Sequence, residues 1–189
     1  MGAIDMKKRQ MKIEEYENAS GVCTIMISNA RFQKNFSSCV QKVIKPFLKE
    51  GELFFGFYRE DGVNLTFNRH KGLKSVIPAF FQAHGELRKL NEYLSVARID
   101  SDVCHDQLLL SIFDYYLETV LFHPKVDWDA FLQYHADYLK HRYEDLILNH
   151  FADILFFYFD SGDLSVCFDP EIYDVQEIKN RITEVFAEM

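Results

Sequence analysis

Two pairs of large apolar runs, each pair joined by an acidic turn that contains glycine, are the most restrictive feature of this sequence. The first pair consists of Leu53–Tyr58 and Val63–Asn68, with an Asp-Gly turn between them. The second pair consists of Ile154–Phe159 and Leu164–Phe168. Short apolar, aromatic-rich runs on either side of such turns are typical of β-hairpins. The sequence therefore predicts two hairpins of antiparallel strands.

Apolar residues at helical spacing predict helices before and after each hairpin. The expected helices cover about residues 30–48, 73–90, 102–122, 128–151 and 175–189, and two more strands are expected at 22–27 and 94–99. The order α-β-β-α then occurs twice. It indicates either a duplication, with halves 21–100 and 101–189, or the ordinary alternation of an α+β protein. Both interpretations predict an α+β fold, with helices packed on a largely antiparallel sheet built from β-hairpins.

Chain length and composition favour one globular domain. The chain has 189 residues, of which 48% are apolar and 26% charged, enough to bury a sizeable core. Residues 1–20 are charged and show no clear period, so we expect a charged tail or a short helix before a single domain at 21–189.

Net charge and hydropathy exclude some classes of partner. The formal net charge is −8, which disfavours general binding of phosphate backbones, so no nucleic-acid partner is expected. There is no signal-peptide pattern and no apolar run of membrane-spanning length, so we expect a cytoplasmic protein without a membrane partner. Four cysteines lie outside any C-x-x-C pair and are predicted to be free thiols: Cys23, Cys39, Cys104 and Cys167.

No common catalytic or cofactor motif occurs, so no cofactor is expected. The nearest approach to a metal site is Asp137, His141 and Asp145, spaced four residues apart on the expected helix 128–151. These side chains could bind a metal ion or hold a general base. Further charged residues surround them, and we favour an exposed charged helix face over a metal site.

Polar residues at the first hairpin form the candidate binding site. The strand at 63–68 alternates, so its polar side chains are expected on one face and its apolar side chains in the core. Asn and Thr on an outward face suit hydrogen bonds to a ligand better than the more usual Lys and Glu. The candidate binding residues are Tyr58, Asn64, Thr66, Asn68, Arg69 and His70.

The same region resembles a known family. The segment Val43-Ile44-Lys45-Pro46-Phe47-Leu48 is followed by Phe54-Phe55-Gly56-Phe57-Tyr58, an acidic turn, and Asn64-Leu65-Thr66-Phe67-Asn68. This order is similar to the C-terminal, elimination-type domain of class I lanthipeptide dehydratases, shared with thiopeptide maturation proteins. The resemblance covers about residues 20–90.

The family's cationic residues are replaced in this chain. Phe57 stands where the family has a strand arginine, and Asn64, Thr66 and Asn68 stand where it has a histidine and two arginines. Elimination of a glutamyl ester needs cationic or acid–base groups near the leaving carboxylate. The resemblance therefore implies a peptide-binding scaffold that has lost the elimination chemistry.

Three functions are compatible with these patterns. The first is a non-catalytic binding or accessory protein for a peptide or protein partner, related to the maturation of ribosomal peptides. The second is a small-molecule enzyme with a pocket between sheet and helices, which would use Tyr58, Arg69, His70 or the Asp137–His141 stripe. The third is an acidic immunity or chaperone-like interaction protein.

Overall fold

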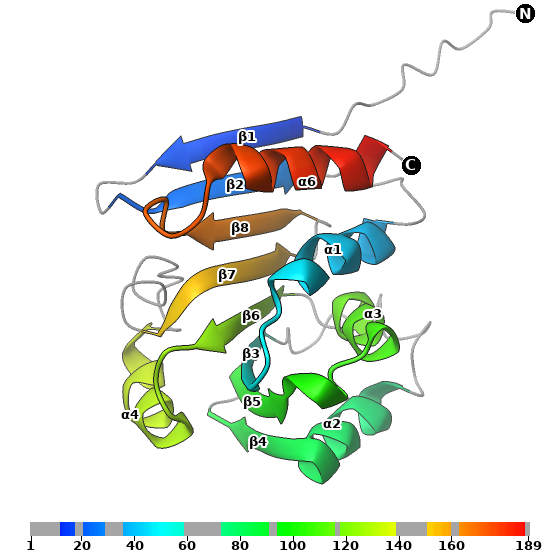
Figure 1. Cartoon of the computed structure of the whole chain (residues 1–189). Coiled ribbons are helices and arrows are strands. Elements are labelled where there is room, and N and C mark those ends of the chain that lie inside the picture. Colours follow the sequence, from blue (N-terminus) through cyan, green and yellow to red (C-terminus); the bar gives the residue numbers. More distant parts are fainter. Residues whose placement is uncertain are drawn as a thin grey trace, which may run out of the picture.

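A computed structural model of the chain describes residues 12–17, 21–28, 36–58, 73–90, 94–115, 118–138, 151–159 and 163–187 (Figure 1). The strands are β1 (Lys12–Glu17), β2 (Cys23–Ser28), β3 (Glu52–Tyr58), β4 (Gly85–Lys89), β5 (Leu94–Asp100), β6 (Glu118–Pro124), β7 (Ala152–Phe159) and β8 (Leu164–Phe168). The helices are α1 (Phe36–Ile44), α2 (Leu73–His84), α3 (Asp106–Tyr115), α4 (Trp128–Tyr138) and α6 (Val175–Ala187). Short 3-10 turns occupy Lys45–Phe47 and Ser101–Val103.

All eight strands belong to one sheet, in the order β1-β2-β8-β7-β6-β3-β5-β4. Every neighbouring pair is antiparallel. Helices pack on this sheet, so the predicted α+β fold is confirmed.

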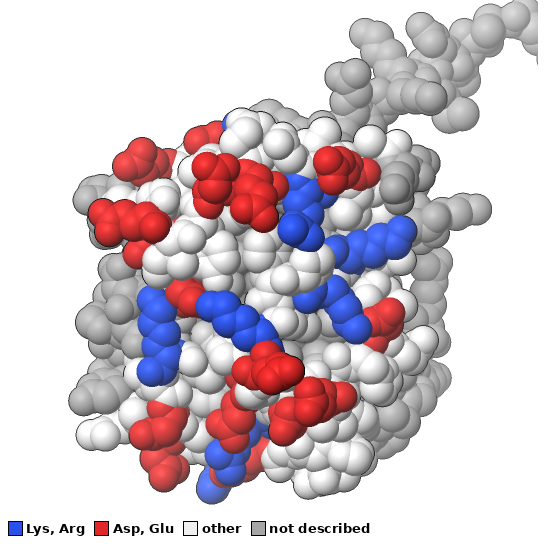
Figure 2. Space-filling view, in the orientation of Figure 1, with Lys and Arg blue, Asp and Glu red and all other residues white. Residues whose placement is uncertain are grey.

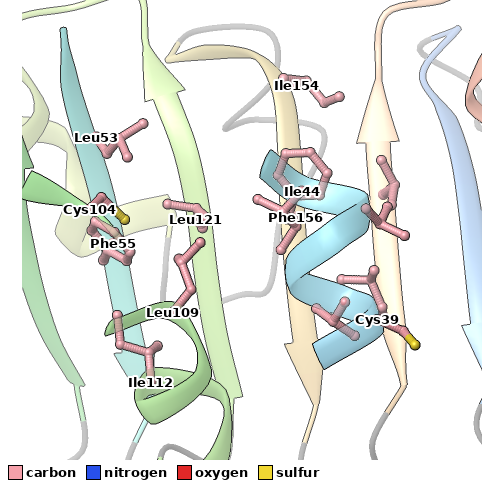
Figure 3. Packing of buried hydrophobic residues seen from close by; sticks show 14 of the residues in the cluster. Cys39, Ile44, Leu53, Phe55, Cys104, Leu109, Ile112, Leu121, Ile154 and Phe156 are labelled. Carbon is pink, nitrogen blue, oxygen red and sulfur yellow. The ribbon is translucent and has the colours of Figure 1, made fainter. Parts of the chain in front are cut away.

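Both faces of the central strands are buried. Leu53–Phe57 of β3 are all buried, and alternate residues enter two separate apolar clusters. The larger cluster lies between the sheet and α1, α2, α3 and α6, and we call this side the helix face. Figure 3 shows residues from α1 and α3 in this cluster above β3, β6 and β7. The smaller cluster lies on the opposite side, which we call the α4 face, because Trp128 and Phe131 of α4 cover it.

The pairing of β3 corrects the first predicted hairpin. Residues 54–58 of β3 are paired with β5 on one edge and with β6 on the other. No free edge is left there for residues 63–68, the expected hairpin partner, which lie outside the described residues. β5 and β6, which come later in the chain and contain several β-branched residues, pair with β3 instead of the strand that the Asp-Gly turn predicted at 63–68.

The second predicted hairpin is confirmed. β7 pairs with β8 in a continuous register from Ile154 opposite Phe168 to Tyr158 opposite Leu164. The strand pairing of the two halves therefore differs, because β7 lies beside the strand that follows it and β3 does not.

Two predicted helices extend too far. The helix expected at 73–90 ends at His84, and Gly85–Lys89 form β4. The helix expected at 102–122 is a 3-10 turn and α3, and Glu118–Pro124 form β6. Thr119, Val120 and Phe122 favour a strand, and in β6 their backbone groups pair on both edges.

The N-terminal segment is also different from the expectation. Lys12–Glu17 do not form a tail or a helix but the edge strand β1, antiparallel to β2. Ile13 packs against the larger cluster, while Glu15, Tyr16 and Glu17 are exposed. The single inward apolar residue was too weak a pattern to reveal a strand. Among the described helices, none combines the length and the apolar character that crossing a membrane requires.

Candidate functional site

The structure describes little of the binding site predicted at the first hairpin. Tyr58 is the last residue of β3, opposite Leu94 and Glu118, and its side chain lies outside the described part. Asn64, Thr66, Asn68, Arg69 and His70 also lie outside the described residues. This site therefore stays a prediction.

The possible metal site predicted at Asp137, His141 and Asp145 is also largely outside the described residues. Asp137 belongs to α4, but its side chain is not described, and His141 and Asp145 lie outside the described residues. Within the described ranges, no three His, Cys, Asp or Glu side chains gather in a way that could hold a metal ion.

The four cysteines are buried and free, as predicted. Cys104 belongs to the larger cluster on the helix face, together with Leu53 and Phe55 (Figure 3). Burial raises the pKa of its thiol from 9.0 to about 12. The thiolate is the nucleophilic form, so this thiol is unreactive at neutral pH.

One cluster of ionisable side chains lies where β3 and β7 begin. Lys49 Nζ lies 2.6 Å from Asp153 Oδ2 and 5.9 Å from the centroid of the Tyr173 ring. The hydrogen bond to Asp153 raises the pKa of Lys49, and burial raises the pKa of Tyr173. Both groups therefore keep their protons at neutral pH. The arrangement fastens the 45–50 loop to β7.

Charges of both signs alternate over the helix face. Figure 2 shows Lys and Arg side chains interspersed with Asp and Glu. Several are ion pairs between separate elements, including Lys45 with Asp106 and Lys179 with Glu15. This face therefore presents a mixed surface rather than a field of one sign to a charged ligand.

The edge strand β4 is the feature of the described chain best suited to contact a partner. It is the outermost strand at one end of the sheet, with α2 in front of it (Figure 1). β4 follows α2 without a loop, because Gly85 comes directly after His84. A Cβ atom at Gly85 would lie 1.9 Å from the carbonyl oxygen of Arg98, so only glycine allows β4 to approach β5 here.

The direction of the backbone groups of β4 follows from its pairing with β5. The amide of Leu90 donates to the carbonyl of Leu94 at 2.9 Å, so these opposite residues are a hydrogen-bonded pair. Hydrogen-bonded and non-hydrogen-bonded pairs alternate along an antiparallel ladder. The amides and carbonyls of Glu86 and Arg88 consequently point toward β5, and those of Leu87 and Lys89 point out of the sheet.

No described strand pairs with the outward groups of Leu87 and Lys89. Gly85 and Lys89 are exposed, and Leu87 is half-buried against the larger cluster. The other edge strand, β1, is also paired on one side only, and its side chains Glu14 and Tyr16 form a hydrogen bond with each other. The β4 edge therefore presents the outward backbone groups of Leu87 and Lys89, to which no described strand is paired.

Charged and aromatic side chains line the α4 face beside this edge. Arg98 of β5 lies opposite Glu86, with its Cζ 5.8 Å from the Trp128 ring centroid. Its guanidinium nitrogens lie 3.4 Å from carboxylate oxygens of Glu52 and Glu86. Arg88 also bonds Glu86, and this bond is the main reason that the pKa of Glu86 is lowered. The edge thus carries fixed charges, with the Arg88 side chain 61% exposed.

The edge was missed in the sequence because residues 85–89 were assigned to a helix. Two signals were present: glycine directly after the apolar stretch of α2, and the alternation Glu86, Leu87, Arg88. Glycine near the end of a helical pattern is a stop signal, and alternation is the period of a strand.

Comparisons with models of protein families, with curated proteins and with solved structures gave no match to this chain. The resemblance to the lanthipeptide dehydratase domain accordingly stays a prediction from the sequence.

Proposed function

We propose that this chain is a non-catalytic binding protein, whose peptide or protein partner adds an extended segment to the free edge of β4. The observation that carries the proposal is the set of outward amides and carbonyls of Leu87 and Lys89 on an edge strand with which no other described strand pairs. Strand addition to such an edge is a common mode of peptide recognition, in which backbone hydrogen bonds supply the affinity.

Four described side chains with shifted pKa values show no general acid or base among them. The pKa values of Lys49 and Cys104 are raised, and those of Glu86 and Asp106 are lowered. Each shift moves the group away from neutral pH, whereas a general acid or base works best with a pKa near the working pH. These side chains stabilise the fold in one protonation state.

The sequence supplies the argument for a peptide as the partner. The similarity to the elimination domain of lanthipeptide dehydratases implies a scaffold that binds an extended peptide. We also place the protein in the cytoplasm, because four buried free thiols are usual in a reducing compartment.

Replacement of Lys89 by proline tests the proposal. The Lys89 amide points out of the sheet, so Lys89→Pro removes a donor for the added strand and leaves the ladder to β5 intact. We expect a phage-displayed library of random unstructured peptides to yield binders on the wild-type protein that lose at least tenfold in affinity for Lys89→Pro.

Lys89→Ala is the matched control, because it removes the same charge and keeps the amide. It should bind the selected peptides nearly as well as wild type. The proposal fails if folded Lys89→Pro binds these peptides normally, or if the library yields no binder that depends on the edge.

A further inference from the structure

We infer that two copies of this chain pair β4 to β4 across a two-fold axis at Leu87, which closes the free edge when no other partner occupies it. This inference rests on the proposed function, because it uses the same outward backbone groups. It names one partner for them, a second copy of the chain.

The axis at Leu87 uses the outward backbone groups of β4. Antiparallel pairing about this residue places Leu87 opposite Leu87 of the second copy, and Gly85 opposite Lys89 of the second copy. The amide and the carbonyl of Leu87 both point outward, so the two copies of Leu87 can exchange two hydrogen bonds, and the outward groups of Lys89 face Gly85 of the other copy. No side chain at Gly85 obstructs Lys89.

The same register is complementary in charge. It places Glu86 of each copy opposite Arg88 of the other, on the α4 face. Opposite charges directly across two strands are stabilising, and like charges are destabilising. Arg88 needs only to exchange its intrachain contact with Glu86 for the equivalent contact in the second copy.

Other ways of pairing two copies through their edges are disfavoured. An axis at Glu86 would oppose two glutamates, and an axis at Arg88 would oppose two arginines. Self-pairing of β1 would bring together two acidic strands, each with Glu14, Glu15 and Glu17. Charge therefore selects β4 over β1 and Leu87 over its neighbours.

The pairing also completes the burial of an apolar side chain. Leu87 is half-buried on the helix face, and its counterpart in the second copy would cover its exposed part. A strand of five residues offers a small interface, so we expect a weak dimer that depends on concentration.

Two charge variants test the register. Arg88→Glu gives an edge with two glutamates, and Glu86→Lys gives an edge with two cations. Each variant alone opposes like charges twice, so its dimer should dissociate at least about tenfold more readily than the wild-type dimer in sedimentation equilibrium. An equimolar mixture of the two variants restores opposite charges at both positions and should form a 1:1 heterodimer.

Increasing salt should weaken the heterodimer, because its charged pairs are exposed. Circular dichroism and thermal melting of each variant establish that the monomer is folded. Lys89→Pro should remove the wild-type dimer, whereas Lys89→Ala should keep it. The inference is overturned if the two charge variants fail to associate when mixed, or if either associates alone as well as wild type.

Amide hydrogen exchange separates this inference from the proposed function. A wild-type monomer with fast exchange at Leu87 and Lys89 and edge-dependent peptide binding would overturn the dimer alone. Protected Leu87 and Lys89 amides in a monomer would overturn both, because the edge would then be covered within the chain. The charge variants should retain peptide binding, since strand addition depends on the backbone.

Discussion

Two glycines show that the same residue type can be required for different reasons. Gly21 has φ of +77°, but a Cβ atom there would meet nothing within 4 Å. Gly85 has no positive φ, yet a Cβ atom there would lie inside the contact distance of the Arg98 backbone. The first glycine is needed for its conformation, and the second for the space between β4 and β5.

Gly85→Ala should be much more harmful than Gly21→Ala. The alanine at position 85 must push β4 from β5, and we expect a loss of about 3 kcal/mol in the free energy of unfolding. At position 21 only the left-handed backbone is disfavoured, which costs about 1 kcal/mol. Urea unfolding of both variants measures the difference, and equal losses would contradict the close approach at β4.

Cys104 gives the protein a predictable sensitivity to alkali. Its pKa is 9.0 in an ordinary environment and about 12 in the fold. Above pH 9 the unfolded chain loses the thiol proton and the folded chain keeps it, so the free energy of unfolding falls with pH. Each pH unit between these values costs about 1.4 kcal/mol.

The comparison of wild type with Cys104→Ala isolates this effect. The alanine variant is expected to be less stable at pH 7, because it leaves a small cavity, but its stability should fall less steeply between pH 9 and pH 11. Val40→Ala is the control, since it also creates a cavity in the same cluster and has no titrating group. Parallel pH profiles for wild type and Cys104→Ala would show that the thiol is not responsible.

At the scale of elements, local patterns identified strands best where turn chemistry and apolar character agreed. β2, β5 and the β7–β8 hairpin lie where the sequence predicted them. The predicted element boundaries were wrong where one apolar stretch contains a helix and then a strand, as at α2 to β4 and at α3 to β6. Tyr116, Leu117 and Val120 continue the helical spacing of α3, so the period alone could not locate the boundary.

Local sequence patterns could not predict the strand order or the β4 edge, and the reason is physical. The Asp-Gly pattern at 60–62 predicts pairing with the next strand in sequence, but β3 is paired with β5 and β6, and helices cover its aromatic residues on both faces. The energy of that burial depends on residues far along the chain. An edge is defined by the absence of a neighbour, and it can be recognised only when the whole sheet order is known.

The two apolar clusters share the same strands, so the whole molecule should unfold as one unit. Phe54 and Phe55 are neighbours in β3 and lie in different clusters. Phe54 contacts the α4 aromatics, with its ring centroid 4.9 Å from that of Trp128, while Phe55 packs on Phe81 of α2. Loss of either cluster exposes strands that support the other.

This coupling can be measured because Trp128 is the only tryptophan. Its fluorescence reports on the α4 face, and the reactivity of Cys39 and Cys104 reports on the helix face. We expect the two probes to give coincident urea transitions, as in a two-state protein. A fluorescence transition at lower urea would show that α4 detaches while the helix face stays folded.

The place of β2 between β1 and β8 has a consequence for synthesis on the ribosome. The β1–β2 hairpin joins the sheet only through β8, a strand that lies much later in the chain. The apolar segment Val22–Ile27 therefore emerges long before its neighbour exists, and β1 alone can pair with it meanwhile. Exposed apolar strands of this kind aggregate readily. A nascent chain of this protein should thus depend on chaperones until residues 164–168 have left the exit tunnel.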